Sequence, residues 1–409
     1  MSDNKIHLIL PSKKEKEMAN NNNLILAKPR YEILDGLRGV AAMLVVLFHI
    51  LETYSSGPAF HPMNHGYLGV DFFFVLSGFV IGYAYDDRWN RMTMWEFFKR
   101  RIVRLHPLVI LGCLFGLFMF YFTDSPMFPF VNETPVWKLI VMTLVAFLMI
   151  PALTQWDIRG WNETNALNNP TWSLMFEYVA NILYALFIRK LSTRLLVLLV
   201  VLFALLIVNL TMNFDWFAVW GERSAEAYTV IGGWSMTPDH LLIGYTRLLY
   251  PFFMGLLLSR IGRHIKVRAG FWVCSAMVAA IMWMPRIGGE VHPWMNGVYE
   301  TLIILFFLPL IVSIGAGSQV KGKTSVWWCK FLGEISYPLY IMHYPFIYLQ
   351  LKWAENHHNA PLSQHIFVGI SVFFLALGVA YAALKVYDIP VREWLTNKFL
   401  RKLNYKKAT

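Results

Sequence analysis

The sequence predicts an all-α polytopic membrane protein, and three observations support that fold class. Of the 409 residues, 57% are hydrophobic and only 15% are charged. The mean hydropathy of +0.46 is too high for a soluble domain of this length. Apolar runs of about 20 residues, the length at which a helix crosses a bilayer, recur along the chain. We expect about ten transmembrane helices plus one short re-entrant or interfacial helical segment, with both termini cytoplasmic.

Eleven apolar segments are candidates for crossing the membrane. They are residues 34–54, 66–85, 103–123, 137–153, 172–188, 195–212, 240–258, 269–284, 298–316, 332–350 and 366–384. Segment 137–153 is the weakest candidate, because it is short and is bounded by Pro135 and Pro151. If it enters the membrane without crossing, 29 Lys and Arg residues face the cytoplasm and five face outward. This is the asymmetry that the positive-inside rule describes, so ten crossings are predicted.

The regions outside these segments are short and basic. Residues 1–32 are predicted to be a disordered basic cytosolic tail without a cleavable signal peptide, and residues 386–409 a basic cytosolic C-terminal tail. Residues 33–385 form the membrane domain between them. The net charge of +11 belongs to these tails and to the inner loops, so it does not indicate a nucleic-acid partner. Neither a disulfide pattern nor metal-ligand spacing is visible, and we expect no metal site.

The first apolar segment, LDGLRGVAAMLVVLFHI, contains an arginine and a histidine. Arg38 and His49 are eleven residues apart, which places them about 20° apart on one helix face and roughly 16 Å apart along the axis. Glu52, three residues beyond His49, can orient the imidazole ring. In one interpretation, Arg38 extends to the interface while His49 makes a polar helix contact. Alternatively, the face is a channel with an anion held at one end and a base at the other.

The third segment begins with the basic sequence FFKRRIVRLHP. Arg101 and Arg104 are three residues apart and share a helix face near the inner membrane surface. Any inner loop can be basic, which is one interpretation. The other is a cytosolic phosphate clamp formed with Arg38, because guanidinium groups are well matched to phosphate.

Two more segments carry carboxylates. Asp71 lies near the outer end of GYLGVDFFFVLSGFVIGY, where it either caps the helix or pairs with His49 or a substrate hydroxyl. In NNPTWSLMFEYVANILYALF, the residues Glu177, Asn181 and Tyr184 form a polar stripe at i, i+4 and i+7. Such a stripe faces either a structural hydrogen-bond network or a wet cavity.

The tenth segment, GEISYPLYIMHYPF, has a similar stripe. Ser336, Tyr340 and His343 share one face, and the first and last are about 10 Å apart along the axis, too far for a nucleophile–base hydrogen bond. We therefore expect substrate positioning or hydrogen bonds that stabilise a kink. Arg247 is a further buried cation that needs a partner, either Glu177 or a substrate anion.

Five stretches, taken in order, resemble the acyltransferase 3 family of membrane O-acyltransferases. They are LDGLRGVAAMLVVLFH, GYLGVDFFFVLSGFVIG, FKRRIVRLHP, NPTWSLMFE and ISYPLYIMHYP. The resemblance runs from about residue 30 to 390 and includes the family's Arg-x10-His and Arg-x-x-Arg pairs. It implies ten transmembrane helices, a cytosolic N-terminus, and transfer from a cytosolic acyl donor, usually acyl-coenzyme A, to an acceptor hydroxyl.

The resemblance also assigns roles. It implies that His49 is the catalytic histidine and that Arg38, Arg101 and Arg104 belong to the donor-binding end. Many members of the family carry a fused SGNH hydrolase-like domain. We expect a stand-alone form here, because the chain ends about 25 residues after its last predicted helix. The resemblance leaves open whether a separate periplasmic or extracellular partner completes the transfer.

The expected protein is thus a multi-pass O-acyltransferase of a bacterial cytoplasmic membrane, using acetyl-CoA as co-substrate with no permanently bound cofactor. Its acceptor is a cell-surface glycan or similar carbohydrate. His49 is the base, with Glu177 and Asp71 as further catalytic candidates. The residues expected to position substrate or bind the oxyanion are Ser336, Tyr340, His343, Asn181 and Arg247. The alternative is a transporter or flippase for an anionic substrate, although no inverted repeat is visible.

Overall fold

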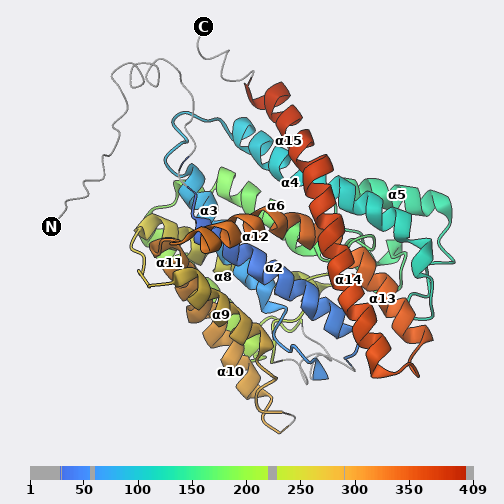
Figure 1. The fold of residues 1–409 in the computed structure, drawn as a ribbon. Coiled ribbons are helices and arrows are strands. Elements are labelled where there is room, and N and C mark those ends of the chain that lie inside the picture. The colour runs from blue at the N-terminus through green and yellow to red at the C-terminus, as the bar shows by residue number, and fades with distance from the viewer. Residues whose placement is uncertain (1–27, 29, 56–59, 220–227, 290, 402–409) are drawn as a thin grey trace.

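The computed structural model describes residues 28, 30–55, 60–219, 228–289 and 291–401, and these residues form helices and loops without any strand. The helices pack against one another in a bundle (Figure 1). Seven of the described helices are long and apolar enough to cross a membrane. The all-helical, multi-pass fold class is therefore confirmed. The number of crossings and their orientation stay predictions.

Each of the eleven predicted segments coincides with helical structure, and two of them, 298–316 and 332–350, contain more than one helix. The helices are α2 (Glu32–Glu52), α3 (Leu68–Tyr85), α4 (Met94–Met119), α5 (Val136–Phe147), α6 (Thr171–Leu186), α7 (Thr193–Thr211), α8 (Pro238–Ile261), α9 (Gly270–Trp283), α10 (Trp294–Leu302), α11 (Leu308–Gly317), α12 (Lys323–Met342), α13 (Tyr344–Asn356), α14 (Leu362–Ala382) and α15 (Ile389–Leu395). The 3-10 turns are η2 (Tyr121–Thr123), η3 (Thr154–Trp156) and η4 (Ile188–Lys190). The π turns are η6 (Ile303–Phe307), η7 (Ala383–Asp388) and η8 (Thr396–Arg401).

The distribution of apolar side chains is that of a protein surrounded by lipid. In α3 and α8, 67% of the apolar span is buried inside the protein, whereas in α7 and α14 only 28% is buried. Large hydrophobic side chains are exposed on these two outer helices. They include Leu198, Val201, Leu202 and Leu205 on α7, and Phe367, Ile370, Phe374 and Leu375 on α14. Such exposure is favourable only where the surrounding solvent is hydrocarbon.

The largest differences from the predicted boundaries occur at three places. Helix α4 begins at Met94 instead of 103, because Thr93 and Glu96 form a capping box with bonds of 3.2 and 2.8 Å. Segment 332–350 is two helices, α12 and α13, which meet at His343. The last helix continues past residue 384 through η7, α15 and η8 to Arg401 (Figure 1). The predicted C-terminal tail is thus helical up to that residue, and its remainder, like most of the N-terminal tail, lies outside the described residues.

Helix α5 is the short element expected in the fourth segment. Its 12 residues span about 18 Å, less than the roughly 30 Å thickness of a bilayer's hydrocarbon core. Helix α9, with 14 residues, is also short for a crossing.

The two ends of the described chain lie at the same end of the bundle. Lys28 donates to the carbonyl of Tyr83 (2.7 Å), near the end of α3. Helix α14 starts beside the C-terminal end of α2, where the Tyr54 hydroxyl donates to the carbonyl of His365 (3.3 Å). The helix that continues from it then passes Arg104, whose charge interacts with Asp388. A chain that crosses a membrane an even number of times has both of its ends on the same side, as the predicted ten crossings require.

Glycines bring two pairs of helices into close contact. A Cβ atom at Gly78 would lie 2.0 Å from the carbonyl oxygen of Phe252, and one at Gly255 would lie 2.0 Å from that of Val75, so α3 and α8 touch backbone to backbone. Between α2 and α12, a Cβ at Gly39 would lie 2.2 Å from the carbonyl oxygen of Leu332. This second contact sets the position of the candidate site.

We predict that Gly255→Val destabilises the protein strongly, because its added Cβ meets a backbone carbonyl that cannot move aside. Overpacking commonly costs about 1–3 kcal/mol. Thermal unfolding of the detergent-purified protein should show a lower Tm or no folded fraction. Gly378→Val is the matched control, since a Cβ there meets no atom within 4 Å. Equal Tm values for the two variants would contradict the close α3–α8 contact.

Candidate active site

His49 lies near the C-terminal end of α2, held by a carboxylate and stacked on a second histidine. Its Nδ1 is 2.8 Å from Oε2 of Glu52, which confirms the expected i, i+3 contact. Because the carboxylate accepts this hydrogen bond, Nδ1 carries the hydrogen and Nε2 is left with its lone pair. The ring stacks on His343 with centroids 5.5 Å apart, and Tyr344 meets it edge-on at 5.0 Å. This arrangement leaves a lone pair on Nε2 of His49 that can accept a proton.

His343 is completely buried at the junction of α12 and α13. Its Nδ1 faces the carbonyl oxygens of Leu339 (3.1 Å) and Tyr340 (2.9 Å), which can only accept, so Nδ1 carries a hydrogen. Its Nε2 is buried and has no hydrogen-bond partner among the described residues. A proton there would have no acceptor, and the ring is therefore neutral with a lone pair on Nε2.

At the opposite end of α2, three arginines lie close together. Arg38 donates from Nε to Oγ of Ser336 (2.8 Å) and from its terminal nitrogen to the carbonyl of Gly333 (3.0 Å). Arg104, on α4, is exposed and interacts with the like charges of Arg38 and Arg101. No hydrogen bond engages its guanidinium within the described part of the chain. Three converging guanidinium groups, one of them uncommitted, form a site suited to an anion.

Glu177 belongs to this arginine end of the site. Its Oε1 accepts from Arg101 at 2.6 Å and from Ser77 at 3.0 Å, so the carboxylate joins α6 to α4 and α3. The amide of Asn181 donates to the backbone carbonyl of Glu177 (2.7 Å). Tyr184 bonds elsewhere, to Asp86 at 2.6 Å. In the predicted polar stripe, Glu177 and Tyr184 thus make contacts outside α6, whereas the amide of Asn181 bonds within the helix.

Asp71 and Arg247 are each other's partners. Two guanidinium nitrogens of Arg247 lie 2.7 and 3.2 Å from the two carboxylate oxygens of Asp71, and both side chains are buried. Arg247 also donates to the carbonyls of Tyr67 (2.8 Å) and Gly232 (3.1 Å). The expected pairing of Arg247 with Glu177 is therefore wrong. The expected contact of Asp71 with His49 is also absent, because Arg247 occupies both of its oxygens.

The donors expected to bind an oxyanion are engaged within the protein. The hydroxyl of Tyr340 donates to the carbonyl of Pro170 (3.0 Å) and contacts Oγ of Ser173 (2.7 Å). Ser336 donates to the carbonyl of Gly333 (3.0 Å) while accepting from Arg38. In this structure these side chains hold the helices around the site in place.

Glu163 is a buried carboxyl that the sequence analysis did not single out. It lies in the loop between α5 and α6, outside the spanning helices, and Oε2 accepts from the Tyr348 hydroxyl at 2.8 Å. Arg159 is 3.9 Å away, with its guanidinium over the ring of Tyr348. Burial raises the pKa of Glu163 to about 8, and the charge of Arg159 opposes that rise. The sequence signal that could have indicated Glu163 is an acidic residue within the asparagine-rich stretch WNETNALNN, directly before PTWSL.

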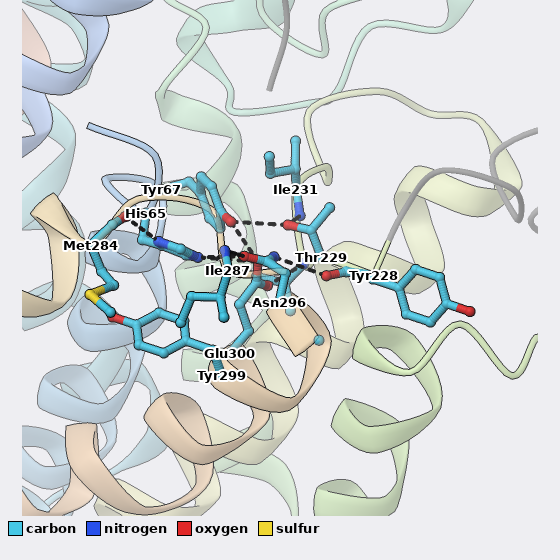
Figure 2. Close-up of polar contacts among 12 residues, drawn as sticks. His65, Tyr67, Tyr228, Thr229, Ile231, Met284, Ile287, Asn296, Tyr299 and Glu300 are labelled. Atoms are coloured by element: carbon cyan, nitrogen blue, oxygen red, sulfur yellow. Dashed lines mark hydrogen bonds and ion pairs between the residues drawn. The ribbon is translucent and has the colours of Figure 1, made fainter. Parts of the chain in front are cut away.

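A second buried glutamate anchors a separate polar cluster (Figure 2). Glu300 accepts from Tyr67 (2.5 Å), Asn296 (2.8 Å) and the backbone nitrogen of Val230 (2.7 Å), so both of its oxygens have partners. His65 joins the cluster through Asn296 (2.9 Å). This network ties α10 to the start of α3. Among the described residues, no group of three or more His, Cys, Asp or Glu side chains is placed to hold a metal ion.

Comparison with known proteins identifies the type of protein. A family model described as "Acyltransferase domain" matches residues 31–385. The chain is 25% identical over 381 residues to "O-acetyltransferase OatA" of Staphylococcus aureus, covering 89% of this chain and 58% of that protein. It is 24% identical over 398 residues to "Putative peptidoglycan O-acetyltransferase YrhL" of Bacillus subtilis, covering 91% of this chain and 59% of that protein.

A shorter relative is "Protein 2 in picA locus" of Rhizobium radiobacter, 32% identical over 167 residues, which are 38% of this chain and 81% of that protein. The chain thus spans less than two thirds of the length of the two O-acetyltransferases. No solved structure matches it.

We predict that Asp71→Asn destabilises the fold, because it leaves the buried guanidinium of Arg247 without its counter-charge. Breaking a buried pair commonly costs about 3–5 kcal/mol. Adding Arg247→Met should restore part of the stability, and a double-mutant cycle of thermal or denaturant unfolding measures this coupling. An Asp71→Asn variant as stable as the parent, but inactive, would instead assign the carboxylate a chemical role.

Proposed function

The chain belongs to the acyltransferase 3 family, and we propose that it transfers an acetyl group from cytosolic acetyl-CoA to a hydroxyl of a cell-envelope carbohydrate. It is a multi-pass membrane acyltransferase. With an acyltransferase domain over most of the chain, the transporter alternative is not retained. One observation carries the proposal: Arg38, whose charge acts on Arg104 of α4, and the proposed base His49 lie toward opposite ends of α2 and both contact α12 or its end.

The arginine end suits the phosphates of coenzyme A. Arg104 has a free guanidinium for a phosphate oxygen, while Arg38 is held beside it by Ser336. The positive-inside rule assigns this end to the cytosol, with ten crossings and both termini on that side. The thioester arm then extends along α2 toward His49, roughly 16 Å away.

The histidine end suits proton removal from an alcohol. Nε2 of His49 takes the hydroxyl proton as the acceptor oxygen attacks the thioester carbonyl and forms the new C–O bond. When the tetrahedral intermediate collapses, the C–S bond breaks and the imidazolium returns its proton to the leaving thiolate. Glu52, at 2.8 Å from Nδ1, holds the reactive tautomer and stabilises the imidazolium. Atoms and charges balance, and no metal is needed.

The relatives support a proposal for the acceptor and the cell compartment. One of them is named as a putative peptidoglycan O-acetyltransferase and another as an O-acetyltransferase, both from bacteria. We therefore propose a bacterial cytoplasmic membrane as the location and a surface glycan as the acceptor. Acetyl-CoA is a co-substrate in this scheme, and the lipid bilayer surrounds the apolar faces of α7 and α14.

We predict that His49→Ala lowers the rate of transfer by about 10²–10⁴-fold, the usual contribution of a general base, without lowering Tm. Glu52→Gln should cause a smaller loss, because glutamine still accepts from Nδ1 but does not stabilise the imidazolium. Incorporation of labelled acetyl from acetyl-CoA into membrane-vesicle glycan measures both. Glu355→Gln, an exposed residue near the end of α13, is the control. Undiminished transfer by a folded His49→Ala variant would refute the assignment.

We predict that acetyl-CoA raises the Tm of the purified protein and that Arg104→Gln abolishes most of this rise. A ligand that binds only the folded state at 100 times its Kd stabilises by about 2.7 kcal/mol. Arg263→Gln, which removes an exposed charge from the loop after α8, should keep the response. The donor assignment fails if neither acetyl-CoA nor longer acyl-CoAs shift the Tm of the parent.

A further inference from the structure

Four buried polar atoms that have no hydrogen-bond partner among the described residues belong to the loop 163–169 and to the junction of α12 and α13. They are Nε2 of His343, Oδ1 of Asn168, Oδ1 of Asn169 and Oε1 of Glu163. Leaving a buried polar atom unpaired costs about 1–3 kcal/mol, and native structures contain few of them. Several of them in one place, beside the proposed base, point to a bound ligand that supplies the missing hydrogen bonds.

Contacts between the loop 163–169 and the segment 341–348 bring these atoms together. The amide of Asn168 donates to the carbonyl of Ile341 at 2.8 Å, and Tyr348 donates to Glu163 at 2.8 Å. The rings of Tyr348 and Tyr344 are 4.7 Å apart, and that of Tyr344 is 5.0 Å from His49. The side chain of Asn169 also interacts with Tyr344. The loop therefore lies one side chain away from the proposed base.

The unpaired atoms determine what kind of group fits. Nδ2 of Asn168 faces a carbonyl, which fixes the orientation of the amide and leaves its oxygen free to accept. Nε2 of His343 likewise can only accept. The one carboxyl of the cluster, Glu163, lies 3.9 Å from Arg159. No group of three or more His, Cys, Asp or Glu side chains among the described residues is placed to hold a metal ion. A neutral ligand rich in hydroxyl groups meets these requirements, because a hydroxyl donates to the acceptors and pairs with the Glu163 carboxyl in either protonation state.

We propose that Glu163, Asn168, Asn169 and His343 form the acceptor subsite, which binds a hydroxyl-rich acceptor and presents one hydroxyl to Nε2 of His49. The inference rests on the proposed function and deepens it. The subsite lies at the His49 end of α2 and shares no residue with the arginine end. Donor binding and acceptor binding are therefore separable by mutation.

The test compares Glu163→Gln with Glu300→Gln in the full-length purified protein. Both residues are fully buried glutamates that accept from a tyrosine hydroxyl, but only Glu163 has an oxygen without a partner. Glutamine at 163 can still accept from Tyr348, which turns its amide nitrogen, a donor, toward the site. The KM for acetyl-CoA and the KM for the glycan fraction extracted from the same membranes are measured for each variant. Asn169→Ala provides a second variant that alters the subsite without removing a buried carboxyl.

We expect Glu163→Gln and Asn169→Ala each to raise the KM for the glycan about tenfold, equivalent to about 1.4 kcal/mol at 25 °C. The KM for acetyl-CoA should stay at the parent value, and Glu300→Gln should change neither constant. If the parent transfers acetyl groups but a folded subsite variant has an unchanged KM for the glycan, the acceptor subsite alone is overturned. An equal rise of the glycan KM in Glu300→Gln would overturn it too. Absence of any acetyl-CoA-dependent transfer by the parent would overturn the proposed function and the subsite with it.

Discussion

The close contact between α2 and α12 is the constraint on which the site depends. Gly39 lets α2 approach the backbone of Leu332, and the two helices then run side by side in the same direction. This places Arg38 level with Ser336, and His49 level with His343. In lipid, no hydrophobic effect drives helices together, so such contacts depend on small residues and on hydrogen bonds between helices. The bond from Arg38 to Ser336 supplies the second of these at the same interface.

Buried charges in this protein fall into two kinds. The pair of Asp71 and Arg247 is mutually satisfied, and Glu300 has a partner for each oxygen. These groups hold α3, α8 and α10 together. Glu163, by contrast, has a buried oxygen without a hydrogen-bond partner among the described residues. Because burying an unsatisfied polar group is costly, the incomplete sites are better evidence of binding than the complete ones.

Features that depend on local periodicity were predictable from the sequence, and features that depend on distant contacts were not. The eleven helical segments, the shared face of Arg38 and His49, and the contact between His49 and Glu52 all follow from helix geometry. The partner of Arg247 was mispredicted, since Asp71 is 176 residues away and Glu177 was an equally plausible carboxylate. Glu163 was missed because its partner, Tyr348, is 185 residues away and the loop around it has the composition of a surface segment.

Arg38, which belongs to the proposed donor anchor, and the base His49 lie on one uninterrupted helix, so α2 fixes the spacing between them. A helix has a fixed rise per residue, so the distance from Arg38 to His49 along α2 does not change with the acyl group carried by the donor. This fixed spacing corresponds to the part of the donor that all coenzyme A thioesters have in common. Selection among acyl groups then depends on the side chains around the His49 end of α2, where His343 and Tyr344 contact His49. Two related chains can therefore share the whole donor end and still differ in the group that they transfer.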